Sequence, residues 1–134
     1  AMERFDFDSI LFPVNFATFY KGNFGRKVIT TAKSKGVAIL ALKSLARQRW
    51  PKNDPSRKEY SKCWYQPLTK REEARLGLCF TLSQPVTAAI PPGEESLFRM
   101  AVDLAMAFKP ISKGGLEKVK QMAKSLNPVF QAKT

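Results

Sequence analysis

An uninterrupted apolar segment at residues 37–42, Val-Ala-Ile-Leu-Ala-Leu, most constrains what this chain can fold into. A strand that is apolar on both sides has to be buried on both faces, which is typical of parallel sheets covered by helices. Two further apolar segments, residues 7–16 and 86–90, read as strands on either side of it in the sequence. We expect them to join it in one parallel sheet, because each alternates with a helix-like stretch.

Helical periodicity and capping residues mark the segments between these strands. Residues 26–35 carry apolar side chains on one face and stop at a glycine. Residues 69–84 begin with Thr69 and Glu72, whose spacing predicts a capping box, and end before a proline. Apolar residues recur at helical spacing in two later segments, 97–108 and 116–126.

Between the second strand and the next helix the periodic pattern breaks. Residues 47–68 contain three prolines and four large aromatic residues, which predicts a long loop. Loops of this length are usually lids or disordered segments, and the aromatic content argues against simple disorder. The predicted order is β-α-β-loop-α-β-α-α within a single domain, residues 1–134. Because a complete (β/α)8 TIM barrel takes about 250 residues, a chain of 134 corresponds to about half of one.

Composition restricts the partner class and the compartment. The net charge of +12 would suit nucleic acid or an acidic membrane surface. The basic residues are spread over predicted solvent faces, however, so a solvated or phosphate-attracting surface is favoured over nucleic acid. No apolar stretch is long enough to cross a bilayer, which argues against a membrane partner. The cysteines, Cys63 and Cys79, have no metal-site or disulfide-framework spacing, and Cys79 is expected to be a small buried hydrophobe. With no visible signal peptide, the predicted localisation is cytoplasmic.

Three sequence blocks resemble the C-terminal part of the aldo/keto reductases, which are NADP(H)-dependent oxidoreductases with a TIM-barrel fold. The segment SILFPVN at 9–15 is similar to the family's sixth strand, and GVAILALKSLA at 36–46 to its seventh. Residues 76–82, followed by QPVTAAIP at 84–91, resemble the seventh helix and eighth strand. The resemblance extends over about residues 5–130 and implies a partial (β/α)8 barrel of about three βα units plus a C-terminal helix.

In that family these strands hold the nicotinamide cofactor, so the resemblance implies a set of cofactor-binding residues. Asn15 corresponds to the residue that contacts the nicotinamide carboxamide. The chain departs from the family at Leu42, where the family often has a stacking aromatic, and at Pro92-Gly93, where a Lys-Ser pair is usual. The remaining positions fall on the pyrophosphate-wrapping segment, the adenosine-phosphate turn and the region of a phosphate-binding arginine. The complete implied set is Asn15, Leu42, Lys43, Ser44, Leu45, Pro92, Gly93 and Arg99.

The catalytic residues of the family lie on its first four strands, which have no counterpart in this sequence. Hydride transfer to a carbonyl needs a proton donor beside the carbonyl oxygen, and the chain contains no histidine. The predicted function is therefore the cofactor-binding portion of an aldo/keto-reductase-like oxidoreductase, binding NADP(H) or NAD(H) but inactive alone. Two alternatives stay open: a non-enzymatic basic binding module and an inert half-barrel fragment. Exposed apolar surface on such a half-barrel predicts self-association into a dimer or larger oligomer.

Overall fold

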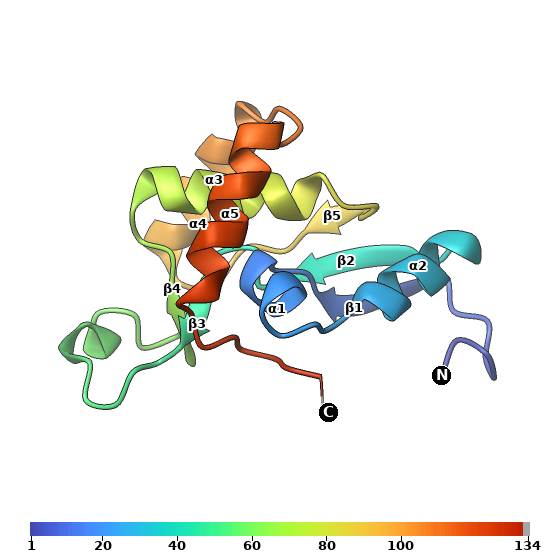
Figure 1. Cartoon of the computed structure of the whole chain (residues 1–134), viewed down its shortest axis with the longest axis horizontal. Helices are drawn as coiled ribbons and strands as arrows, with labels where there is room; N and C mark the ends of the chain where they lie inside the picture. The colour runs from blue at the N-terminus through green and yellow to red at the C-terminus, as the bar shows by residue number, and fades with distance from the viewer. Residues whose placement is uncertain (133–134) are drawn as a thin grey trace.

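A computed structural model describes residues 1–132 of the chain (Figure 1). Its centre is a three-stranded parallel sheet with the order β1-β2-β5, formed by β1 (Ser9–Pro13), β2 (Ala38–Leu42) and β5 (Ala88–Ala89). Leu40 of β2 pairs with Leu11 on one side and Ala88 on the other. The predicted α/β class and parallel sheet are confirmed, although the third strand is shorter than expected.

One face of this sheet is covered and the other is partly open. Ile39 and Ala41 of β2 pack against Ile29 and Ala32 of helix α2 (Arg26–Ser34), which runs along the sheet in Figure 1. On the opposite face Leu11 is 61% exposed. The helix expected at 26–35 is confirmed, whereas burial of both sheet faces holds only in part.

The first strand is shorter than the sequence predicted. It ends at Pro13, and a five-residue helix, α1 (Phe16–Tyr20), follows at once. The reason lies in Asn15, whose side-chain oxygen accepts hydrogen bonds from the backbone N–H groups of Ala17 and Thr18 and so caps the helix. The expected strand at 7–16 is therefore wrong beyond Pro13.

The segment expected to be one long loop, residues 47–68, contains an antiparallel hairpin. Its strands are β3 (Ala46–Arg49) and β4 (Tyr65–Pro67), and a 3₁₀ turn, η1 (Pro55–Lys58), lies between them. Polar side chains order it: Gln66 Nε2 donates to Asp54 Oδ2 at 3.0 Å, and Trp50 Nε1 donates to the Cys63 carbonyl at 2.8 Å. The irregular part is thus confined to the connection between the two strands.

Three helices form the rest of the molecule: α3 (Arg71–Leu82), α4 (Glu95–Met106) and α5 (Lys113–Lys124). All three were expected, with small shifts of their ends. The capping box was wrong, because the N-cap of α3 is Lys70 and Glu72 pairs with Arg75 instead of reaching back to Thr69. The main core lies between these helices, α1 and the hairpin. Its fully buried large side chains include Phe16, Leu45, Leu68 and Phe80.

Cys79 of α3 is 6% exposed and packs as the small buried side chain the sequence predicted. Within residues 1–132, no helix combines the length and the apolar character needed to cross a lipid bilayer.

Candidate functional site

The loops that follow β2 and β5 enclose a small cavity of about 110 Å³. The carboxyl ends of parallel strands are where α/β proteins usually place their binding residues. The hairpin supplies the remaining wall, through the segment before β4. The lining residues are Leu42, Lys43, Ser44, Leu45, Lys62, Trp64, Tyr65, Ile90, Pro91, Pro92 and Gly93. This set includes two lysines and no carboxylate, so the cavity favours an anion.

Lys43 occupies an unusual conformation at the mouth of this cavity. Its φ of +71° places a non-glycine residue in the left-handed region, which costs about 1–3 kcal/mol unless the surroundings hold it there. Its ammonium lies 4.8 Å from the ring centre of Tyr65 and 5.2 Å from that of Trp64. Partial burial lowers the pKa of Lys43 below its ordinary value. The lysine is thus held by the hairpin aromatics beside the cavity.

Asn15 holds the loop that carries Lys43. Its amide nitrogen donates to the carbonyl oxygens of Lys43, at 3.1 Å, and Ala46. Its side-chain oxygen accepts from the N–H groups of Ala17 and Thr18, at 3.0 and 3.1 Å. An asparagine amide has two donor hydrogens and two acceptor lone pairs, so all four are engaged within the chain. Asn15 therefore positions the loop and does not line the cavity.

Ser44 is the polar group of the site that lacks a partner. Its side chain is 1% exposed, and its hydroxyl makes no hydrogen bond within the described part of the chain. Leaving a buried hydroxyl unsatisfied costs about 1–3 kcal/mol. Ser44 also borders a second, mostly apolar cavity of about 260 Å³ between α3, β5 and α4. A ligand reaching Ser44 would gain a hydrogen bond that the free chain does not make.

Six of the eight residues singled out from the sequence share this one cavity; Asn15 and Arg99 do not line it. Arg99 lies on α4, where its Nε and Nη2 donate to Glu95 Oε1 at 3.0 and 2.8 Å. Its side chain is 76% exposed beside a separate shallow depression that Phe98 and Val102 also line. At Gly93 an added Cβ would meet no atom within 4 Å, so the site has no steric need for glycine there.

Sequence reasoning missed the hairpin residues of the site, Lys62, Trp64 and Tyr65. The aromatic richness of residues 47–68 was a usable signal, but it did not show which rings would face the carboxyl end of β2. Trp64 is 54% exposed, whereas burial raises the pKa of Tyr65 well above its usual range. Tyr65 therefore keeps its proton at neutral pH. The arrangement is suited to holding an anion.

Comparisons with known proteins add no relative: no family model, curated protein or solved structure matches the chain. Within the described residues, 1–132, no cluster of three or more histidine, cysteine or acidic side chains could hold a metal ion.

Proposed function

We propose that this chain binds the pyrophosphate of a nicotinamide dinucleotide, as the cofactor-binding part of an aldo/keto-reductase-like oxidoreductase. One observation carries the proposal. Six residues that the resemblance assigns to cofactor binding, drawn from the segments 42–45 and 92–93, meet around one cavity with Lys43 and Lys62 in its wall. These segments are about 50 residues apart in the chain, so their meeting is a property of the fold.

The sheet topology agrees with the partial barrel in this proposal. In a (β/α)8 barrel, consecutive strands are parallel neighbours, each followed by a helix on the outer side. Here β1, β2 and β5 are parallel neighbours in chain order, and α2 packs on one face only. The inserted hairpin lies at the carboxyl end of β2, on the side where such barrels carry their functional loops.

The size of the cavity limits what it holds. Pockets that enclose a whole small ligand measure about 300–1,000 Å³. A cavity of about 110 Å³ accommodates a phosphate group, so the rest of a dinucleotide would lie across the exposed surface near Trp64. Lys43 and Lys62 would supply the charge and Ser44 a hydroxyl donor, while Asn15 would act by holding the loop. Carbonyl reduction by this chain alone is not expected, because the resemblance places the family's catalytic residues on four strands that have no counterpart in this sequence.

Cofactor titration followed by tryptophan fluorescence tests the proposal. NADPH and NADH should quench Trp64 in a saturable way, and excess inorganic pyrophosphate should reverse the quenching. Lys43→Ala should weaken binding at least tenfold. Lys33→Ala, which removes the same charge from an exposed position on α2, should not. Equal affinity in both variants, or no saturable quenching, would refute the proposed site.

We also propose that the chain associates with copies of itself, and the exposure of one residue of β1 supports this. Leu11 is a large apolar side chain, 61% exposed, in the middle of β1, which is an edge strand of the sheet. An edge strand with exposed apolar residues offers both hydrogen-bonding groups and apolar area to another chain. A second copy pairing there would bury this surface without involving the anion cavity.

A further inference from the structure

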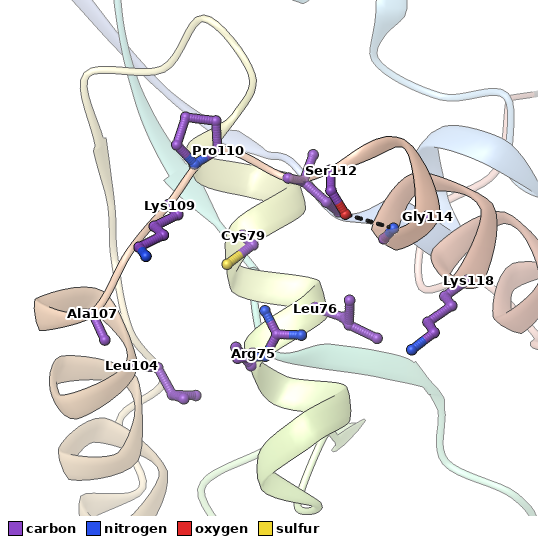
Figure 2. A pocket seen from close by; sticks show the side chains of 12 residues that line it. Arg75, Leu76, Cys79, Leu104, Ala107, Lys109, Pro110, Ser112, Gly114 and Lys118 are labelled. Carbon is purple, nitrogen blue, oxygen red and sulfur yellow. Dashed lines mark hydrogen bonds between the residues drawn. The ribbon is translucent and has the colours of Figure 1, made fainter.

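A larger cavity, about 440 Å³, lies between the three long helices, and none of its residues belongs to the proposed cofactor site. Figure 2 shows α3 behind it, with α4 on one side and the start of α5 on the other. The connection between α4 and α5 crosses its upper end and brings Lys109 and Ser112 to the cavity. Its volume falls within the range of about 300–1,000 Å³ typical of pockets that enclose small molecules.

The inner walls of this cavity are apolar. Leu76 of α3 and Leu104 of α4 are buried, at 5% and 7% exposure, and Ile111 is half-buried between the helices. The thiol of Cys79, 6% exposed, completes the wall formed by α3. Water in the cavity cannot form hydrogen bonds with these apolar side chains. A ligand with an apolar body is therefore favoured here, because it displaces this water.

Three basic side chains, Arg75, Lys109 and Lys118, come to the cavity from three separate parts of the chain. Arg75 is already compensated, because its Nε and Nη2 donate to Glu72 at 3.0 and 2.8 Å. Lys109 and Lys118 are different: within residues 1–132, neither has a carboxylate oxygen within 4.0 Å, although, after the hydrogen bond from Arg75, the charge of Lys118 also helps to lower the pKa of Glu72. The cavity thus joins an apolar interior to a basic rim on which Lys109 and Lys118 make no close ion pair.

The backbone at the start of α5 adds to this preference for negative charge. The first N–H groups of a helix have no intrahelical partner and carry a partial positive charge. Ser112 Oγ already accepts from the N–H of Gly115 at 3.1 Å. At Gly114 an added Cβ would meet only Ser112 Oγ, at 4.0 Å, so the backbone is open on that side. A negative group beside Lys118, which lies on the same helix, would approach this helix start.

We propose that this cavity binds a small amphiphilic carboxylate, with its apolar body between α3 and α4 and its carboxylate facing the basic rim formed by Arg75, Lys109 and Lys118. The apolar walls select against a bare inorganic anion, and the basic rim selects against a neutral or cationic amphiphile. This site is independent of the proposed cofactor site. Either one can fail while the other stands.

Four probes of related structure test this site on the ¹⁵N-labelled chain by two-dimensional NMR. Octanoate should shift the amide signals of Gly114, Gly115 and Ile111 saturably. Octanol lacks the charge and should bind at least tenfold more weakly. Octylammonium and inorganic phosphate, which lack the correct charge or the apolar body, should not saturate these signals. A second readout is alkylation by N-ethylmaleimide, which octanoate should slow at Cys79 and leave unchanged at Cys63.

Variants locate the charge. Lys109→Gln and Lys118→Gln should each weaken octanoate binding about threefold to tenfold. Lys124→Gln, which removes an exposed charge from the last turn of the same helix, should leave binding unchanged. The proposal is overturned if octanol binds as well as octanoate, or if both lysine variants bind like the unmodified chain. It is also overturned if the shifts fall on Ala89, Ala101 and Ala105, which line the other apolar cavity.

Discussion

Replacing Asn15 tests whether one buried amide holds the proposed site together. The side chain is 2% exposed and makes four hydrogen bonds, two to the start of α1 and two to the carbonyl oxygens of Lys43 and Ala46. Loss of a helix N-cap costs about 1 kcal/mol, and each lost internal hydrogen bond about 1 kcal/mol. We therefore expect Asn15→Ala to lower the free energy of unfolding by about 3 kcal/mol. That is a large share of the roughly 5–15 kcal/mol that stabilises a small domain.

Two further variants separate the two halves of this effect. Asn15→Ser keeps an oxygen that caps α1 but loses the bonds to the loop, so about 2 kcal/mol of the loss should remain. Asn15→Asp keeps the cap and places an oxygen opposite the Lys43 and Ala46 carbonyls. Burial and these carbonyls disfavour the charged form. The aspartate variant should therefore gain stability as the pH falls and its carboxyl takes up a proton.

Urea unfolding monitored by circular dichroism measures all three variants. If Asn15→Ala loses less than about 1 kcal/mol, the value of a cap alone, the two bonds to the loop contribute nothing to stability. If Asn15→Ser is as unstable as the alanine variant, the cap contributes nothing. Fluorescence titration of NADPH with the serine variant adds a functional readout. A loosened loop at Lys43 should weaken cofactor binding even where the domain stays folded.

Four other predictions follow from single contacts. Gly22→Ala should destabilise the chain, since its Cβ would lie 2.3 Å from the Phe130 carbonyl oxygen; unchanged urea unfolding would contradict this. Gly114→Ala should raise stability by up to about 1 kcal/mol, because the helical position has room for a methyl group; a loss would contradict it. As the pH rises, NADPH affinity should fall with a midpoint below pH 10.5, the value of an ordinary lysine, because burial lowers the pKa of Lys43; a midpoint at or above 10.5 would refute the role. Leu11→Glu should shift the chain towards a monomer by light scattering, and an unchanged mass would exclude the open sheet face as the contact.

Strong periodic signals in the sequence predicted the framework of the fold. The apolar run at 37–42 gave β2 and its central place in a parallel sheet, and the amphipathic spacing at 97–108 gave α4. These features depend on burial patterns that repeat along the chain. The five-residue helix α1 could not be found this way, because it is little more than one turn long and depends on the Asn15 cap.

The rest of the site depended on tertiary contacts that spacing does not encode. The hairpin at 46–67 has polar residues such as Gln48 and Gln66 in its strands, and their side chains bond only once the strands pair. Arg99 was assigned to the site because the resemblance places a phosphate-binding arginine in its region. In the structure, Arg99 lies on the solvent-exposed face of α4, where it forms an ion pair with Glu95. The order of strands and helices predicted that segments 42–45 and 92–93 lie at the same edge of the sheet. It did not predict which side chains of α4 would lie beside them.

The most direct test of the central claim is a two-dimensional NMR titration of the ¹⁵N-labelled chain with NADPH. Dinucleotide binding at this cavity should give saturable shifts of the amide signals of Lys43, Ser44, Leu45 and Gly93 and of the side-chain N–H of Trp64. Excess inorganic pyrophosphate should reverse these shifts. Absence of saturable shifts, or shifts confined to residues outside this cavity, would contradict the claim that the loops after β2 and β5 form a dinucleotide phosphate site.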